Sequence, residues 1–113
     1  GWHAAHKGYT GYLRWAYNSW TKSPLTDSRF TAWPAGDTYL VYPGPFSSVR
    51  FEKMIEGAQD FEKIRLLRKE YSAKNQTEKL QQLENALKQF ELGNLPKTTA
   101  AETLSKTQEI LNN

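Results

Sequence analysis

The sequence predicts an α+β fold that is mostly helical, with three to four helices and a two-strand element. Residues 48–113 carry apolar side chains at the three- and four-residue spacing of amphipathic helices. Residues 1–47 instead gather glycine, proline and aromatic residues around two short runs of strand-like composition. A chain of 113 residues suffices for one small domain with one core. We therefore expect residues 1–113 to form a single unit, with an aromatic strand and loop half followed by a helical half.

The first two expected helices have clear boundary residues. Residues 2–7 read as a short helix that is closed by Gly8 just beyond its end. A long helix is expected to begin after a cap at Ser47 or Ser48 and to run to about Lys74. Its apolar stripe is formed by side chains three and four positions apart: Phe51, Met54, Ile55, Ala58, Phe61, Ile64, Leu67 and Tyr71.

Two further helices are expected in the last forty residues. One should start near Thr77 and end before Gly93, with leucines and a phenylalanine facing inward. The other begins with the capping-box pattern Thr99-x-x-Glu102. It is short and polar, so we expect it to fray unless it packs on the other helices.

Two runs in the aromatic half have the composition of strands. The first covers residues 9–17 and is weakened at Gly11, and the second covers residues 38–42 and stops at Pro43. Between them, residues 18–36 have turn chemistry throughout. Loops of that length in compact domains are usually functional or disordered.

Charge and composition argue against several classes of function. The net charge is +3, all of it in residues 1–50, where the basic residues are scattered and form no stripe, so we expect no nucleic-acid partner. No apolar run of about eighteen residues is present, and we expect no membrane partner. Without cysteine there is no disulfide or thiolate metal site. His3 and His6 lack a third ligand nearby, so we expect no metal and no other cofactor.

Aromatic and amide side chains gather where the two strand-like runs end. The first run leads into Trp15, Tyr17, Asn18 and Trp20, and the second ends at Tyr42. Tyrosine and tryptophan offer a large apolar face together with a polar edge. Strand ends that present such groups are typical of a cleft for sugars or other rings.

Arg14 and Asp37 are the charged candidates in this part of the chain. An arginine in the middle of a strand must be paired or directed at solvent or a ligand. Arg14 therefore either forms a structural ion pair with Asp37 or orients a ligand or a catalytic carboxylate. Asp27 and Asp37 are also the only carboxylates of the aromatic half, and glycosidases commonly use two. We favour structural roles for both, Asp27 as an Asx-type turn residue.

Several motifs of this chain, taken together, are similar to a known family. The chain resembles the C-terminal part of glycoside hydrolase family 123, and equally the related uncharacterised domain that ends many bacterial glycosyl hydrolase-like proteins. The resemblance covers roughly residues 2–71, and residues 75–113 carry no recognisable signature. It is carried by residues 11–20, Ser23-Pro24-Leu25, Trp33-Pro34-Ala35-Gly36-Asp37, residues 39–45, Ser48-x-Arg50-Phe51-Glu52, Glu56-Gly57 and Asp60-Phe61-Glu62.

The resemblance implies a (β/α)8 barrel that acts on terminal N-acetylgalactosamine of glycans. It also implies that the substrate's acetamido group is the nucleophile and that an adjacent Asp-Glu pair supports it. This chain contains no Asp-Glu dipeptide. By resemblance, the pair would lie in an upstream barrel segment of the same protein, which would be the partner of this chain. The chain would then supply the last two strands, paired in parallel through a crossover, and the last helix of the barrel.

The resemblance also implies roles for the residues at the strand ends. With no catalytic residue in this chain, these residues would line the site for a glycan or amino sugar. The predicted substrate-binding set is Arg14, Trp15, Tyr17, Asn18, Trp20, Asp37 and Tyr42. Bacterial family members are often exported, so the resemblance implies a periplasmic or extracellular location.

Two other functions remain open at this level. One is a stand-alone carbohydrate-binding module with Trp15, Trp20 and Trp33 as its platform. The other is a helical protein-interaction domain whose aromatic half is simply core. Sugar affinity of the isolated chain would favour the module, and a concentration-dependent mass without any sugar response would favour the interaction domain.

Overall fold

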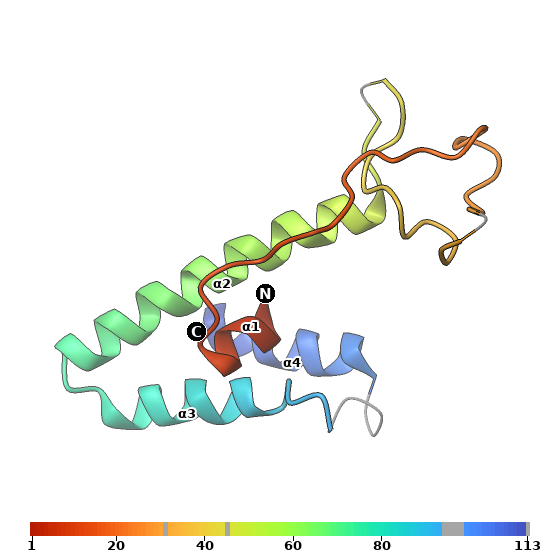
Figure 1. Ribbon diagram of the computed structural model, residues 1–113. Coiled ribbons are helices and arrows are strands. Elements are labelled where there is room, and N and C mark those ends of the chain that lie inside the picture. Colours follow the sequence, from red (N-terminus) through yellow and green to blue (C-terminus); the bar gives the residue numbers. More distant parts are fainter. Residues whose placement is uncertain (31, 45, 94–98, 113) are drawn as a thin grey trace. The chain divides into compact units, whose positions relative to one another are not determined.

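The computed structural model describes residues 1–30, 32–44, 46–93 and 99–112. These residues form four helices, α1 (Trp2–Lys7), α2 (Val49–Ala73), α3 (Thr77–Lys88) and α4 (Ala100–Asn112), which confirms the expected helical character (Figure 1). None of these helices is long and apolar enough to cross a membrane. The chain divides into two compact units. We call Gly1–Tyr12 with Gly57–Asn113 the helical unit, and Leu13–Glu56 the loop unit.

The helix ends follow the boundary signals in the sequence. Gly8 closes α1 in the left-handed conformation at φ 71°, which a residue without a side chain adopts without strain. The Ser48 hydroxyl accepts a hydrogen bond from the Phe51 main-chain N–H at 3.1 Å and so caps α2. The Thr99 hydroxyl accepts one from the Glu102 N–H at 3.3 Å at the start of α4. The caps predicted at these three helix ends are confirmed.

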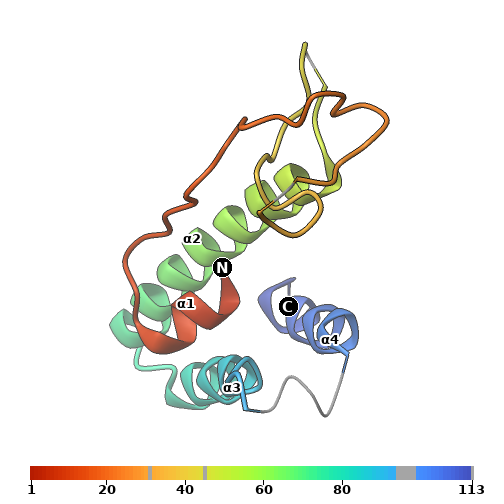
Figure 2. The same cartoon turned by 45° about the vertical axis from the view of Figure 1, so that its right-hand side comes forward.

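The core of the helical unit joins both ends of the chain. Trp2 of α1 stacks on Phe90, just beyond α3, with ring centroids 5.0 Å apart. In both views α1 lies between α2 and α3, and α4 lies beside α3 (Figures 1 and 2). The buried residues of this core are Trp2, Ala5, Ile64, Leu83, Leu87, Phe90 and Leu111.

Two polar side chains of α2 tie the other helices to this core. The Arg68 guanidinium donates to both carboxylate oxygens of Glu84 in α3, at 2.6 and 2.9 Å, and to the main-chain oxygen of Ala5 in α1 at 3.1 Å. A planar guanidinium can serve both partners because its five N–H groups form a rigid fork. Arg68 therefore links three helices through one side chain.

Asp60 makes the second link. Its Oδ2 accepts a hydrogen bond from the Trp2 indole N–H at 2.8 Å and another from the Gln108 amide at 3.2 Å. The bond to Trp2 satisfies the polar edge of a ring whose residue is otherwise buried. α1 and α4 are thus both held to α2 at this carboxylate.

The two predicted strands are not formed among the described residues. Among the described residues, one isolated bridge joins Asn18, directly after the first run, to Tyr39 in the second. The bridge is antiparallel, so the expectation of a parallel pair was wrong. Its main-chain bonds run from the Ser19 N–H to Thr38 O at 3.0 Å and from the Leu40 N–H to Tyr17 O at 2.7 Å. The likeness to the last strands of a barrel is not confirmed.

Side chains take the place of a neighbouring strand along residues 37–41. Each of these five successive main-chain carbonyls accepts a hydrogen bond from a different donor. Buried carbonyls need such partners, and four of the five donors here are side chains. In order along the segment, the donors are the Arg14 guanidinium, the Ser19 N–H, the Arg50 guanidinium at 2.9 Å, the Ser48 hydroxyl and the Trp20 indole at 2.7 Å.

Because its carbonyls are satisfied in this way, the segment is buried without belonging to a sheet. Thr38, Tyr39 and Leu40 are 1%, 0% and 6% exposed. They form the centre of the loop unit together with Ala16, which is also buried. Burial also raises the pKa of the Tyr39 hydroxyl, so this side chain is neutral at physiological pH.

Candidate functional site

Asp37 is the centre of a polar and aromatic cluster in the loop unit. Its Oδ1 accepts a hydrogen bond from Arg14 at 2.7 Å, and its Oδ2 accepts a longer one from the Trp15 indole at 3.3 Å. The Trp15 ring lies 5.1 Å from the Trp33 ring, tilted by 43°. Both indoles are about half exposed, at 53% and 50%. We call Arg14, Trp15, Trp33 and Asp37 the Asp37 cluster.

The carboxylate of Asp37 is held in its charged form. The hydrogen bond from Arg14 lowers its pKa, and the Trp15 hydrogen bond and the positive charges of Arg14 and Arg50 act in the same direction. An ionised carboxylate only accepts hydrogen bonds, and it has about four lone-pair sites. Arg14 and Trp15 occupy one site on each oxygen, so the cluster presents an acceptor beside two exposed ring faces.

Arg14, which binds Asp37, and Thr38, which follows it in the chain, each have one buried polar atom without a hydrogen-bond partner among the described residues. These atoms are Arg14 Nε and Thr38 Oγ1. A buried polar group without a partner costs free energy, since it has lost its water. The hydrogen bonds around Asp37 therefore leave these two atoms unsatisfied within the described part of the chain.

Tyr17 and Asn18 were predicted site residues, and they lie in other contacts. The Tyr17 ring packs edge-on against Phe51 in α2, with centroids 5.9 Å apart. Asn18 is the residue that forms the bridge with Tyr39. Both side chains are exposed at the surface of the loop unit.

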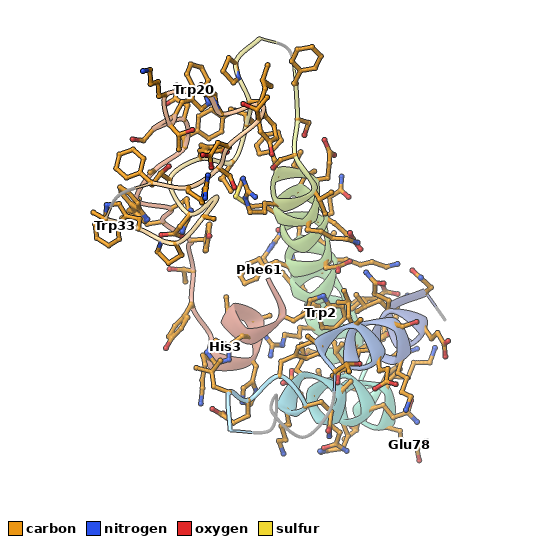
Figure 3. All side chains as sticks on the ribbon, turned by 90° about the vertical axis from the view of Figure 1, so that its right-hand side faces the viewer. Trp2, His3, Trp20, Trp33, Phe61 and Glu78 are labelled. Atoms are coloured by element: carbon orange, nitrogen blue, oxygen red, sulfur yellow. The ribbon has the colours of Figure 1, made fainter. Side chains whose placement is uncertain are left out.

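Trp20 and Tyr42 also lie outside the Asp37 cluster. Trp20 donates its indole N–H to Val41 O, so only its ring face is available to a ligand. Tyr42 packs against Tyr39, with centroids 5.4 Å apart. Figure 3 marks Trp20 and Trp33 at separate places among the loops. Pro45, at the end of the motif that contains Tyr42, lies outside the described residues.

The fold adds Trp33 and Arg50 to the residues around Asp37. Trp33 has a signal in the sequence, because the Trp33-Pro34 turn leads directly to Gly36 and Asp37. Arg50 belongs to the motif Ser48-x-Arg50-Phe51-Glu52 that carries the family resemblance, but the helical pattern places it on an exposed part of α2 and indicates no contact with the loop. Only the folded chain brings its guanidinium to Tyr39 O at 2.9 Å and over the Tyr39 ring at 5.4 Å.

Asp27 is in a different setting from Asp37. Its Oδ1 accepts a hydrogen bond from the main-chain N–H of Arg29 at 3.0 Å, which is the predicted Asx-type turn. The Arg29 guanidinium donates to both carboxylate oxygens at 2.8 Å and lowers the pKa of Asp27 to about 2. This charge is neutralised within two residues of chain, so Asp27 serves as a matched control for Asp37.

Comparison with known families gives the class of this chain. The family model described as the glycoside hydrolase 123 catalytic domain matches residues 1–67. These residues include α1, the whole loop unit with the Asp37 cluster, and most of α2. The class is thus that of enzymes that hydrolyse glycosidic bonds, and the chain belongs to glycoside hydrolase family 123. No curated protein matches the chain.

Proposed function

We propose that this chain is the C-terminal segment of a glycoside hydrolase that acts on glycans containing N-acetylgalactosamine. The chain supplies residues that contact the sugar, and an upstream segment of the same protein supplies the catalytic Asp-Glu pair. Family membership and the lack of an Asp-Glu dipeptide in the 113 residues support this division of labour.

The Asp37 cluster is the observation that carries the proposal. Sugars present C–H faces that pack on aromatic rings and hydroxyls that donate to carboxylates, and binding sites combine apolar walls with a few placed polar groups. Trp15 and Trp33 offer exposed rings, and Asp37 offers a charged acceptor that Arg14 fixes in place. In the proposed site, the Asp37 carboxylate accepts a hydrogen bond from a sugar hydroxyl while the Trp15 and Trp33 indoles stack on the sugar ring.

The other members of the predicted set have more limited roles in this proposal. Trp20 can offer its ring but not its N–H, which is already bound to Val41 O. Tyr17, Asn18 and Tyr42 have a supporting role in this proposal, through their contacts with Phe51 and Tyr39. None of these residues is proposed to take part in bond cleavage.

The experiment that tests this proposal is a titration of the ¹⁵N-labelled chain with N-acetylgalactosamine, read from its four indole N–H signals. We expect the Trp15 and Trp33 signals to shift with the sugar. Trp2 is the internal reference, because it is buried in the helical unit and bound to Asp60. N-acetylglucosamine, which differs at one hydroxyl, tests the selectivity of the response.

Asp37→Asn and Asp27→Asn form the matched pair of variants for this titration. Asp37→Asn should weaken sugar binding about tenfold or more, as expected when a hydrogen bond to a charged group is lost. Asp27→Asn should leave the affinity unchanged. Unresponsive Trp15 and Trp33 signals in the folded chain, or equal losses in the two variants, would contradict the proposed site.

Hydrolysis provides a second test of the division of labour. The chain alone should release no nitrophenol from either anomer of 4-nitrophenyl N-acetylgalactosaminide. Addition of a segment of the same protein that carries the Asp-Glu pair should restore release. Turnover by the chain alone would show that its own residues perform the chemistry and would overturn this part of the proposal.

A further inference from the structure

We propose that Arg50 is a positioning residue that holds residues 36–39 so that the Asp37 carboxylate stays bonded to the Trp15 indole, whose ring contacts Trp33. This inference rests on the proposed function, because the Asp37 cluster that Arg50 positions is the proposed sugar site. It also makes the start of α2 part of the sugar site.

Residues 37–40 are attached to the start of α2 through side chains. Arg50, in the first turn of that helix, donates to Tyr39 O at 2.9 Å. Ser48, which caps the same helix, donates its hydroxyl to Leu40 O. Two residues at one helix end thus hold two successive carbonyls, and Arg14 holds the same segment through Asp37 O.

Gly36 leaves space for the Arg50 guanidinium. This residue is buried and has φ +76°, a conformation that residues with a side chain rarely adopt. A Cβ placed on it would lie 2.8 Å from the Arg50 Nη1. The guanidinium therefore lies against the main chain directly before Asp37, and the absence of a side chain at Gly36 is what admits it.

The planar guanidinium of Arg50 suits this position better than another cation would. Arg50 donates to Tyr39 O, lies over the Tyr39 ring at 5.4 Å and approaches Gly36 with one planar group. Lysine carries the same charge at a single point and cannot make these contacts together. The positive charge also helps to lower the pKa of Asp37. Substitution of Arg50 by lysine or by methionine can therefore separate the effect of its contacts from the effect of its charge.

The test uses Arg50→Met and Arg50→Lys, with Lys53→Met as the matched control. Lys53 lies one turn further along α2, is exposed and pairs with Glu56. The ligand-free readouts are the pKa of Asp37, from its ¹³C carboxyl signal, and the Trp15 indole signal. The ligand readout is the N-acetylgalactosamine affinity from the indole titration.

Arg50→Met should raise the pKa of Asp37, shift the Trp15 signal and weaken sugar binding about fivefold or more. In Arg50→Lys the pKa of Asp37 should stay lowered, because the positive charge remains. The affinity for N-acetylgalactosamine should still fall, because lysine cannot make the contacts of the guanidinium. Lys53→Met should change none of the three readouts. An unchanged Asp37 and Trp15 in Arg50→Met, or full affinity in Arg50→Lys, would overturn the inference.

Gly36→Ala provides an independent route to the same displacement. Its Cβ would push Arg50 away, so it should reproduce the loss of sugar affinity. Gly44→Ala is the control, because Gly44 has φ +85° but its Cβ would meet only the Phe46 ring at an ordinary 3.5 Å. Equal effects of the two alanines would show that backbone strain, and not Arg50, is responsible.

Two outcomes separate this inference from the proposed function. If the wild-type indole signals do not respond to the sugar while Arg50→Met still changes the pKa of Asp37 and the Trp15 signal, the proposed function fails. The positioning role of Arg50 then holds, but the Asp37 cluster has a function other than sugar binding. If Arg50→Met abolishes the Trp20 signal together with that of Trp15, Arg50 stabilises the whole loop unit, and the inference fails.

Discussion

Glu91 shows how one side chain can attach a short helix to its neighbours. Its Oε2 accepts hydrogen bonds from the Lys7 ammonium at 2.5 Å and from His6 Nε2 at 3.0 Å, both in the last turn of α1. The bond from Lys7, then that from His6, lowers the pKa of Glu91 to about 2. Next to them, His3 Nδ1 lies 2.9 Å from Phe90 O. Because the Glu91 side chain is 39% exposed, salt and solvent weaken its ion pairs.

The lowered pKa of Glu91 predicts a pH dependence of stability. A carboxyl whose folded pKa is depressed stabilises the fold above its unfolded pKa, and this contribution is lost as the pH falls towards the folded value. The window for Glu91 therefore runs from its ordinary pKa of 4.5 down to about 2. Glu91→Gln should reduce the fall in the free energy of unfolding across this window, as measured by urea denaturation at several pH values.

Glu109→Gln, which removes an exposed carboxylate of α4, is the control for this prediction. It should keep the pH dependence of the wild-type chain. A Glu91→Gln variant whose stability falls as steeply as that of the wild type would show that the interactions of Glu91 with α1 do not stabilise the fold.

Single residues were predictable from sequence where their partners are close in the chain. Asp27 is bound by Arg29, two residues away, and turn chemistry identified it. Arg14 and Asp37 are 23 positions apart, and the sequence left an ion pair and a ligand contact equally open for Arg14. The structure shows the ion pair. The motif Ser48-x-Arg50-Phe51-Glu52 includes Arg50 but does not indicate its contacts, because these exist only once the loop has folded against α2.

At the scale of elements, the contacts of Arg68 with α1 and α3 predict how much its replacement lowers the free energy of unfolding. Arg68→Met removes three hydrogen bonds and leaves the part-buried Glu84 carboxylate without its partner. We expect a loss of about 1.5–3 kcal/mol in the free energy of unfolding, the range for a hydrogen bond to a charged group. Urea denaturation followed by circular dichroism measures it.

Arg65→Met is the matched control for Arg68→Met. Arg65 lies on the same helix and also makes two hydrogen bonds to one carboxylate, that of Glu62, but this pair is exposed and local. Exposed pairs of this kind contribute little to stability. Equal losses in the two variants would mean that Arg68 does not connect the helices in solution.

Helices were predicted better than strands for a physical reason. Gly8, Ser48 and Thr99 act on helix ends within a few residues of themselves, so their signals can be read locally. Residues 38–42 have the composition of a strand, but the carbonyls of residues 38–41 accept hydrogen bonds from Ser19, Arg50, Ser48 and Trp20, which lie elsewhere in the loop unit. Composition predicted a strand here, but not the side-chain donors that replace a neighbouring strand.

At the scale of the whole molecule, the helical unit depends on residues beyond the family match. The match ends at residue 67, within α2, whereas Leu83, Leu87, Phe90 and Leu111 complete the core around Trp2. A helix as short as α1 does not form in water without such packing. Residues beyond the match, which carry no recognisable signature, therefore supply four of the seven buried residues of this core.

Truncation after residue 75 tests this dependence. The shortened chain should lose α1, and the Trp2 indole signal should move to the position of an exposed tryptophan. The contacts of the Asp37 cluster all lie within the loop unit, so the Trp15 and Trp33 signals should persist. Loss of all four indole signals would mean that the two units fold cooperatively, and an unchanged Trp2 would contradict the assigned role of α3 and α4.

The replacement of a strand by side chains along residues 37–41 has a consequence for mutational tolerance. In a sheet, the ladder bonds come from the main chain and survive almost any substitution on a neighbouring strand. Here the corresponding bonds depend on the identities of Arg14, Trp20, Ser48 and Arg50. In a saturation library, these partly accessible positions should therefore accept fewer amino acids than their exposure suggests, as buried core positions do.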